Sequence, residues 1–490
     1  MHCRGPDNQR VHRAPAGGRL RRNRHYDRAA LHAVRLHARP ALGTLGAPAG
    51  PVAGTASSLY QQQHSGAKAL TVSRYWTVWA AALLFFAAFY ALLVPVPLYM
   101  EAAGLPDWQI GLVLGAFGVA SLVGRPLTGA VSDSLGRRPV ILFGTVSLAA
   151  GAALMSFTSS PVLLFGLRVL QAAGYVTFTT AATALVADLA DPNRRGAALA
   201  LFGAAANVAI TLTPAAVSAG LEQLALQFGC PVSTCPTWCF QAGDGSATVE
   251  GGGLCPIWGR GIGHSAFFLS SALSLLAGGL VWRVIPGVSG RARGGFSFAE
   301  LVSLPQPLRG PMLTTALFGV SFGALLAFLP LLAERRELAS TGAAYAVYGV
   351  SIIATRILTG RLLDRPNRAR VLLPALIINA AGLAGLAVAA DMSILASSAV
   401  LMGIGSGICH PALIAICVDR MPSAQRGRAT AGFYLAFDLG IGLGSWLLGL
   451  VLDAVGLSWL YFAAALVSAV AAVSAPLLSG RQRTQRQRAD

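Results

Sequence analysis

Residues 121–140, SLVGRPLTGAVSDSLGRRPV, contain the end of one long apolar segment, a short charged turn and the start of another apolar segment. The polar skeleton of this stretch recurs with a constant offset of 231 residues, since Arg125 corresponds to Arg356 and Asp133 to Asp364. Further pairs share the offset: Thr128 and Thr359, Gly129 and Gly360, Asp188 and Asp419, Arg195 and Arg426, Gly196 and Gly427, and Phe202 and Phe433. Unrelated apolar segments would not hold one register, so we interpret the chain as two copies of one membrane-embedded unit.

The composition agrees with a membrane protein. Of the 490 residues, 54% are hydrophobic and 11% are charged, and the mean hydropathy is +0.61. Soluble domains carry roughly 25% charged residues, so most of this chain is expected to lie in a lipid bilayer. The formal net charge is +18. We attribute it to arginines on the cytoplasmic side of a membrane and expect no nucleic-acid partner.

Twelve apolar segments follow residue 74, each about as long as the roughly 20 residues that cross the hydrocarbon core of a bilayer. Each should be helical, because lipid offers no partner for unpaired backbone groups. The sequence therefore predicts an all-α polytopic membrane protein with twelve transmembrane helices in two pseudo-symmetric six-helix bundles. The predicted spans are 75–99, 108–132, 139–157, 161–187, 197–221, 263–285, 310–333, 342–363, 370–390, 393–418, 428–452 and 457–479.

These spans divide the chain into two bundles with connecting segments. The N-terminal bundle covers 75–286 and includes a long external loop at 222–262, and the C-terminal bundle covers 310–480. Residues 287–309 are expected to form a cytoplasmic linker, and 481–490 a basic cytoplasmic tail.

Residues 1–74 differ from the rest of the chain, because they are rich in Arg, His, Ala, Gly and Pro and contain only Asp7 and Asp27 as acids. They lack the uninterrupted apolar run of a secretory signal peptide. One interpretation is an organellar transit peptide. We favour a disordered arm, or upstream sequence translated from a start codon placed too early.

The loop charges predict the orientation in the membrane. Arginine-rich loops fall on one side if every segment spans, and by the positive-inside rule this side and both termini are cytoplasmic. A multi-pass protein of the inner, or plasma, membrane is expected. On the other side, Arg335 and Arg336 are offset by Glu334 and Glu337. The other acids of that side are Glu101, Asp107, Glu222, Asp244, Glu250, Asp391 and Asp453.

The external loop 222–262 contains Cys230, Cys235, Cys239 and Cys255. Four cysteines on an outer face predict two disulfides, for which three connectivities are possible. The alternative is a zinc site, which we disfavour because the loop contains no C-x-x-C pair.

The charged turn and its copy, within twelve helices in two halves, resemble the major facilitator superfamily of secondary transporters from about residue 75 to residue 480. The signature that this family carries between helices 2 and 3, G-x-x-x-D-[RK]-x-G-R-R, is matched except at Ser134, where the family usually has a base. The resemblance implies that this turn latches the two halves together on the cytoplasmic face. The alternative is a topology signal with a helix cap. The residues concerned are Gly129, Asp133, Gly136, Arg137 and Arg138, and in the second copy Gly360, Asp364 and Arg365.

Other segments resemble the drug–proton antiporters of the family in part. Arg168 and Gln171 match an R-x-x-Q segment of helix 4. Helix 5 keeps Pro214 of the antiporter motif, but Thr213 replaces the preceding glycine. Helix 1 has no acid in its interior, where many proton-coupled exporters have one.

Asp438 lies about eleven residues into helix 11. A charge at that depth costs roughly 2.5–3.5 kcal/mol on insertion scales, so it should be paired or functional. The resemblance places helix 11 against helix 2 and helix 5 against helix 8. We therefore predict an inter-domain contact between Arg125 and Asp438, and a neutral counterpart between Arg356 and Asn207, the repeat mate of Asp438. Protonation could switch only the first contact; a static ion pair is the alternative.

The resemblance also implies that helices 1, 4, 7 and 10 line a central substrate cavity. The candidate lining residues are Phe86, Tyr90, Arg168, Gln171, Tyr175 and His410. Each has an alternative interpretation. Arg168 could snorkel to the nearby helix end, His410 could bond a backbone carbonyl, and some aromatic rings could face lipid.

The sequence indicates no enzyme. A G-x-S-x-G match around Ser321 lies inside an apolar helix rather than at a strand-to-helix turn, so we interpret it as chance. We expect a monomeric secondary transporter, without cofactor or metal, that exports a small organic drug or metabolite by alternating access at the expense of a proton gradient. The alternatives are uptake or facilitated diffusion without protons, and a membrane sensor that does not transport.

Overall fold

The computed structural model describes residues 73–191, 195–227, 263–285, 306–338, 340–363, 368–422 and 425–486. Within them, twelve helices are long and apolar enough to cross a membrane, which confirms the predicted all-helical class and the twelve spans. Several predictions fall outside the described residues. They concern the arm, most of the linker, the latch residues Asp364 and Arg365, and the loop cysteines Cys230, Cys235, Cys239 and Cys255.

The first span, Ser73–Ala102, is broken by a turn at 91–94. Pro95 starts the helix that follows and has no N–H to donate, so the chain turns there before continuing. The helices of the N-terminal half are α3 (Pro95–Ala102), α4 (Asp107–Leu135), α5 (Arg137–Met155), α6 (Pro161–Leu189), α7 (Arg195–Gln227) and α9 (His264–Val284).

The C-terminal half contains six helices. They are α11 (Gln306–Arg335), α12 (Thr341–Leu363), α13 (Arg368–Ala387), α14 (Met392–Asp419), α15 (Arg426–Val455) and α16 (Leu457–Arg486). Two of them extend well beyond the predicted spans: α11 begins at Gln306 and α16 continues to Arg486. Polar residues continue a helix once its apolar part is nucleated, because propagation adds a hydrogen bond per residue.

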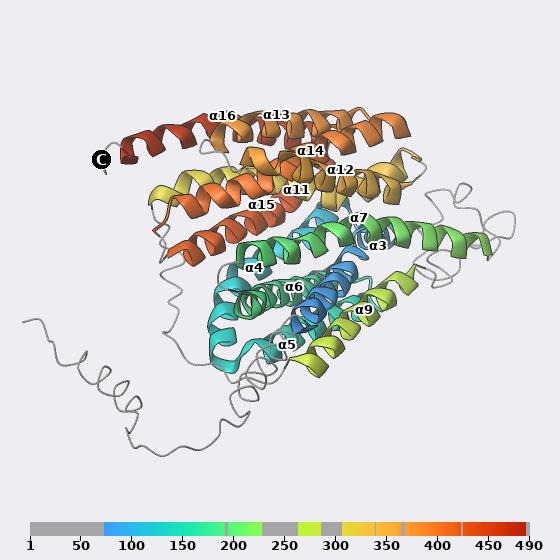
Figure 1. The fold of residues 1–490 in the computed structure, drawn as a ribbon. Helices are drawn as coiled ribbons and strands as arrows, with labels where there is room; N and C mark the ends of the chain where they lie inside the picture. The colour runs from blue at the N-terminus through green and yellow to red at the C-terminus, as the bar shows by residue number, and fades with distance from the viewer. Residues whose placement is uncertain are drawn as a thin grey trace, which may run out of the picture. The chain divides into compact units, whose positions relative to one another are not determined.

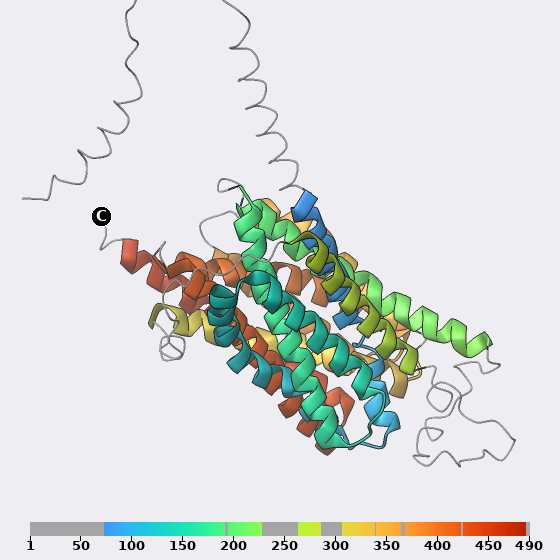
Figure 2. The same ribbon diagram turned by 90° about the horizontal axis from the view of Figure 1, so that it is seen from below.

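The two halves use the same packing scheme. In the N-terminal half α4 packs on α6, and α5 packs on both α6 and α9. In the C-terminal half the equivalent pairs are α12 on α14, and α13 on both α14 and α16. Figures 1 and 2 show these helices running alongside one another. The matching pairs are the structural counterpart of the repeat of 231 residues.

Two helix pairs make the most extensive contacts between the halves, α4 with α15 and α7 with α12. The repeat exchanges these pairs, since it relates α4 to α12 and α7 to α15. They are helices 2 and 11 and helices 5 and 8 in the numbering of the spans, so the predicted pairing is confirmed.

Many large apolar side chains on the outside of the bundle are exposed, including Leu466 (66% exposed) and Phe143 (57%). Four exposed tryptophans lie near the ends of the spans. Trp76 and Trp282 lie at the end where α9 terminates, and Trp108 and Trp459 where α4 and α16 begin. Tryptophan favours the two membrane–water interfaces, so both belts mark the bilayer boundaries.

Asp391 caps the N-terminus of α14, where its carboxylate accepts hydrogen bonds from the backbone N–H groups of Ser393 (2.8 Å) and Ile394 (3.0 Å). The hydroxyl of Ser393 also donates to it, and this bond and the backbone bonds hold the pKa of Asp391 below its usual value. The cap satisfies two donors that the helix leaves unpaired.

We therefore expect Asp391→Ala to lower the melting temperature at neutral pH, and Asp391→Asn to lower it less, because an amide oxygen can still accept. Since the folded-state pKa is depressed, the contribution of the carboxylate is present above its unfolded pKa of about 4 and is lost as the pH falls through the folded value. Thermal unfolding of the purified protein between pH 3 and 7 measures this. If the melting temperatures of wild type and Asp391→Asn depended on pH in the same way, this contribution of the Asp391 carboxylate would be contradicted.

Candidate functional site

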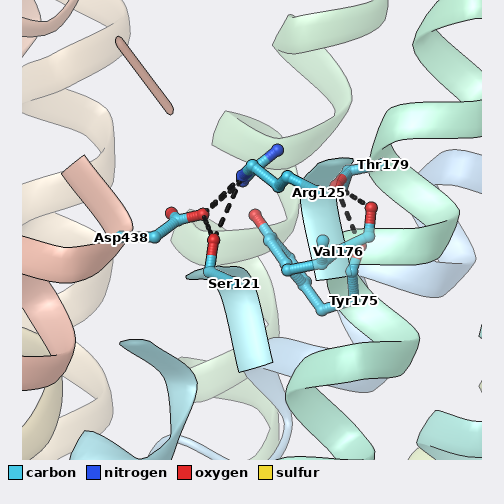
Figure 3. A network of polar contacts seen from close by, with 6 residues as sticks. All are labelled: Ser121, Arg125, Tyr175, Val176, Thr179 and Asp438. Carbon is cyan, nitrogen blue, oxygen red and sulfur yellow. Dashed lines mark hydrogen bonds and ion pairs between the residues drawn. The ribbon is translucent and has the colours of Figure 1, made fainter. Parts of the chain in front are cut away.

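The ion pair of Arg125 on α4 and Asp438 on α15 is buried between the two halves, with only 11% and 4% of the side chains exposed. Both Nε and one terminal nitrogen of the guanidinium lie 2.6 Å from Oδ2 of the carboxylate. Figure 3 shows the two side chains reaching across from opposite helices. A carboxylate and a guanidinium are therefore paired at the depth where lone charges are costly.

Three polar side chains surround this pair. The hydroxyl of Ser121, one turn before Arg125, donates to Asp438 and accepts from Arg125 Nε at 3.2 Å. The ring of Tyr434 lies under the guanidinium, with its centroid 4.9 Å from Cζ, which is within cation–π range. Tyr175 of α6 lies beside the pair and within range of both charges. Asp438 thus has two hydrogen-bond donors, from Arg125 and Ser121.

The repeat-related residues Arg356 and Asn207 are not joined by a hydrogen bond among the described residues. Asn207 donates instead to the carbonyl of Gly203 on its own helix, at 3.2 Å. Nε of Arg356 is buried without a hydrogen-bond partner. The two halves therefore treat their equivalent arginines differently.

Arg168 and Gln171 form a buried pair inside the N-terminal half. Arg168 donates to Oε1 of Gln171 at 2.8 Å, and the Gln171 amide contacts the sulfur of Met155 on α5 at 2.8 Å. The Arg168 guanidinium also lies 5.7 Å from the ring centroid of Phe89. Both side chains thus have partners within one half, although Nε of Arg168 is buried without a hydrogen-bond partner. Tyr175, further along α6, lies by the Arg125–Asp438 pair.

The aromatic residues of the first span form a cluster with α6. Tyr175 lies 4.4 Å from Phe89 and 6.0 Å from Phe86 between ring centroids, and Phe86 lies 6.5 Å from Tyr90. Phe85 stacks on Phe178 at 3.8 Å. All of the first-span rings in this cluster are buried, so they pack within the protein and do not face lipid.

His410 of α14 lies among aromatic rings of α15. Its ring meets Phe433 edge-on at 5.0 Å and Phe437 at 5.3 Å, with Tyr434 at 6.2 Å. The charge of Arg356 also reaches His410. The histidine is therefore part of the same inter-helix region as Arg356 and Tyr434.

The charged turn between α4 and α5 contacts only the N-terminal half among the described residues. Gly136 adopts a left-handed φ of 91°, which favours glycine. Arg137 pairs with Asp133 at 2.6 Å and reaches Asp188 of α6 at 3.4 Å. Arg138 donates to the carbonyl of Trp282 on α9 and stacks on its ring, with Cζ 4.1 Å from the centroid. Within the described ranges, no hydrogen bond or ion pair of the turn reaches the C-terminal half.

Glycines show which ends of the paired helices touch. We call the end at which α4 and α6 terminate the basic end, and the end at which α4 begins the opposite end. Near the opposite end, a Cβ on Gly111 would lie 2.6 Å from Cα of Gly449, and a Cβ on Gly118 would lie 2.9 Å from Cα of Gly442. A Cβ on Gly129, nearer the basic end of α4, would meet nothing within 4 Å. Gly360, Gly196 and Gly427, in the basic-end parts of α12, α7 and α15, are equally open.

An ionic cluster joins the halves at the opposite end. Arg335, the last residue of α11, donates to Glu101 at 2.7 Å and to both carboxylate oxygens of Asp107 at 2.9 and 2.5 Å. The sequence predicted that the charge of Arg335 is offset by its neighbours Glu334 and Glu337, whereas the ion pairs of Arg335 are made with Glu101 and Asp107. Arg335 is the last residue of α11, and its side chain extends to the N-terminal half. There the carboxylates of Glu101 and Asp107 both bind its forked guanidinium.

Arg336 has a different role from its neighbour. It donates to the carbonyls of Leu386, Ala387 and Ala389 at the end of α13, at 2.7–3.1 Å, and to Ser458. It therefore satisfies carbonyl groups that the helix terminus leaves unpaired.

Sequence reasoning missed the roles of Ser121, Tyr434 and the Arg335 cluster. Spacing could have found the first, because Ser121 lies four residues before Arg125 and so on the same face of the helix. The residues of the cluster are separated by 228 and 234 positions, so nothing local connects them. No group of three or more His, Cys, Asp or Glu side chains suited to a metal ion occurs in the described part of the chain.

The fold is thus a helical membrane bundle of two repeat-related halves with buried charges between them. The sequence profile of the Major Facilitator Superfamily matches residues 78–393 and 312–490, and the chain belongs to this family of transporters. An uncharacterised MFS-type transporter of Salmonella typhimurium is 26% identical over 79% of this chain and 91% of its own length. Major facilitator superfamily domain-containing protein 10 of Mus musculus is 38% identical over 21% of this chain, but the match spans only 23% of the mouse protein.

Solved structures show the same fold. The nucleoside transporter NupG aligns with a TM-score of 0.64 at 13% identity, over 83% of this chain and 99% of its own. The human organic anion transporter MFSD10 aligns with a TM-score of 0.59 at 18% identity, over 83% and 99%. A bacterial homologue of the human lysosomal transporter Spinster, in an inward-facing and occupied conformation, aligns with a TM-score of 0.61 at 16% identity, over 83% and 96%. These proteins are transporters rather than enzymes.

Proposed function

We propose that this protein is a secondary active transporter that works by alternating access and couples proton movement to the export of a small organic compound. The observation that carries the proposal is the buried Arg125–Asp438 pair, because its two members come from different halves of the chain. A group that joins the halves, and whose charge depends on a proton, can bias which conformation is populated.

The coupling step follows from the contacts of Asp438. When the carboxylate takes up a proton, it loses its attraction for Arg125, and the contact between α4 and α15 weakens. The groups that face it are Ser121 and Arg125 from α4, Tyr175 from α6 and Tyr434 from its own helix. None of these is a second carboxylate, so Asp438 is the group of this network suited to carry the proton.

Alternation would exchange the contacts at the two ends of the paired helices. In the described conformation the opposite end is closed by glycine packing and by the Arg335 cluster, while Gly129 and Gly360 are uncovered. We propose that the basic end faces the cytoplasm of an inner, or plasma, membrane, as the positive-inside rule indicates. The described state would then be open inward, and the turn Gly129–Arg138 would engage as a latch in the outward-open state.

Breaking the Arg335 cluster should release the opposite end. We expect Arg335→Gln to increase the population open at that end, because three hydrogen bonds between charged groups are lost. Double electron–electron resonance between spin labels at Trp108 and Glu337, in a cysteine-free background, measures the opening. Arg283→Gln, an exposed arginine on α9, is the matched control. Unchanged distance distributions in Arg335→Gln would show that the cluster does not hold this end closed.

The substrate and the direction of transport are inferred from other observations. The names of two solved neighbours, a nucleoside transporter and an organic anion transporter, fit a small organic solute. The R-x-x-Q segment at Arg168 and Gln171 favours export. Facilitated movement without protons is the second candidate, favoured by the apolar interior of the first span, whose acid, Glu101, lies in its last turn. A sensor that binds without turnover is the third.

The test uses proteoliposomes of the full chain that contain a pH-sensitive dye and are challenged with a panel of organic compounds. Compound-induced proton movement, together with net flux of the same compound, is the expected result. Flux without a proton signal would establish the facilitator, and binding without flux would establish the sensor.

A further inference from the structure

The repeat gives Arg125 and Arg356 equivalent places on α4 and α12, but different partners. The acceptors of Arg125 are Asp438 and Ser121. At the offset of 231 residues, the first of these positions holds Asn207 and the second holds Ile352. The C-terminal arginine has therefore lost both the carboxylate and the hydroxyl that satisfy its N-terminal counterpart.

The guanidinium of Arg356 makes no hydrogen bond or ion pair within the described part of the chain. Its Nε is buried and unpartnered, and the titratable groups near it are the neutral hydroxyls of Tyr348, Tyr434 and Tyr90 rather than a carboxylate. The hydroxyl of Tyr348 lies within range of Arg356 and also of Ser406. Since buried donors are almost always paired in native proteins, the unpaired Nε of Arg356 requires an explanation.

The surroundings of Arg356 are otherwise aromatic. Tyr348 packs near Phe322 at 6.5 Å, and Phe322 lies 5.2 Å from Phe437. Phe437 in turn meets the ring of His410. A molecule that reached Arg356 would therefore meet one uncompensated positive charge, hydroxyl groups and apolar ring surfaces.

We propose that Arg356 binds the anionic group of the transported compound, and that this compound is an aromatic or otherwise apolar organic monoanion such as a carboxylate. The inference rests on the transport function proposed above and specifies its substrate class. A carboxylate matches the forked guanidinium with two parallel hydrogen bonds. One negative charge is proposed for this position, because Arg125 already has Asp438 and Arg168 donates to Gln171 within the N-terminal half. The apolar body of the compound would lie against the rings.

Two ligands of matched size test the charge requirement, 4-butylbenzoate and its methyl ester. Binding to the purified full-length protein is measured by thermal shift and by equilibrium dialysis. Wild type is expected to bind the carboxylate and to bind the ester weakly. Arg356→Gln should weaken carboxylate binding at least about tenfold and leave the ester unchanged, because a charge-assisted hydrogen bond is lost. Arg356→Lys should retain part of the affinity.

Asn207→Asp is the most informative variant. It places a carboxylate at the repeat position of Asp438, so that Arg356 gains the kind of partner that Arg125 already has. It keeps Arg356 and should lose affinity for the carboxylate ligand by pairing with the arginine internally. If Arg356→Gln does not fold, Asn207→Asp and Arg356→Lys decide the question. Arg283→Gln is the control for a general loss of positive charge.

Carboxylate binding that is equal in wild type, Arg356→Gln and Asn207→Asp would overturn the inference, as would a preference for the ester or no binding of either ligand to wild type. The same binding assay in Asp438→Asn separates this inference from proton coupling. Carboxylate binding should persist there, whatever happens to proton-driven flux, so that failure of the coupling proposal and failure of the Arg356 site give different results.

Discussion

Asp438→Asn is expected to abolish proton-driven accumulation of substrate while the protein still inserts and folds. An amide cannot change its charge with pH, but its oxygen can still accept hydrogen bonds from Arg125 and Ser121, which both contact the native carboxylate. The hydrogen bonds between α4 and α15 therefore remain, but the attraction between opposite charges is lost and the contact no longer responds to protons. The measurement is flux in proteoliposomes with and without an imposed pH gradient.

Asp453→Asn provides the matched control for this variant. Asp453 lies on the same helix, near its end and exposed, so neutralising it should leave proton-driven flux unchanged. If Asp438→Asn still accumulates substrate when a pH gradient is applied, the carboxylate is a structural partner of Arg125 and the proton is carried elsewhere.

Double variants separate coupling from stability. Asp438→Ala leaves Arg125 buried without its counter-ion and should cost about 3–5 kcal/mol, as is typical when one member of a buried pair is removed. Arg125→Gln combined with Asp438→Asn removes both charges, so it should recover most of that stability without recovering proton coupling. Recovery of coupling in the double variant would exclude a role for the charge itself.

Gly118→Leu should shift the protein away from the described conformation. A Cβ at this position would already lie 2.9 Å from Cα of Gly442, and the atom it meets belongs to a helix backbone that cannot move aside alone. Overpacking of a close contact typically costs about 1–3 kcal/mol, and 1.4 kcal/mol changes a population ratio about tenfold. We expect α4 and α15 to separate at the opposite end, where α4 begins and α15 terminates.

Gly129→Leu, on the same helix, is the informative counterpart. A Cβ there meets nothing within 4 Å in the described state, so the variant should keep this state. It should instead hinder the conformation in which the basic ends of the helices approach. Spin labels at Trp108 and Val455 report the distance between α4 and α15 at the opposite end. Equal distance distributions in Gly118→Leu and Gly129→Leu would contradict the exchange of contacts between the two ends.

The amino-acid sequence by itself determined the architecture. Spans of about 20 apolar residues must be helical in lipid, and the constant offset between Asp133 and Asp364 revealed the two halves. The family resemblance then gave the pairing of α4 with α15 and of α7 with α12. Asp438 was recognisable because a carboxylate in mid-helix is costly unless it has a partner, and its depth on α15 matches that of Arg125 on α4.

Only the tertiary structure decided which partner each polar side chain binds. Arg335 lies beside Glu334 in sequence, yet it binds Glu101 and Asp107 of the other half. Gln171 bonds to Arg168 and contacts Met155 within its own half. The reason is that sequence spacing fixes which residues share a helix face, whereas the rotation and approach of two packed helices decide what that face meets. In this protein those approaches join residues more than 200 positions apart.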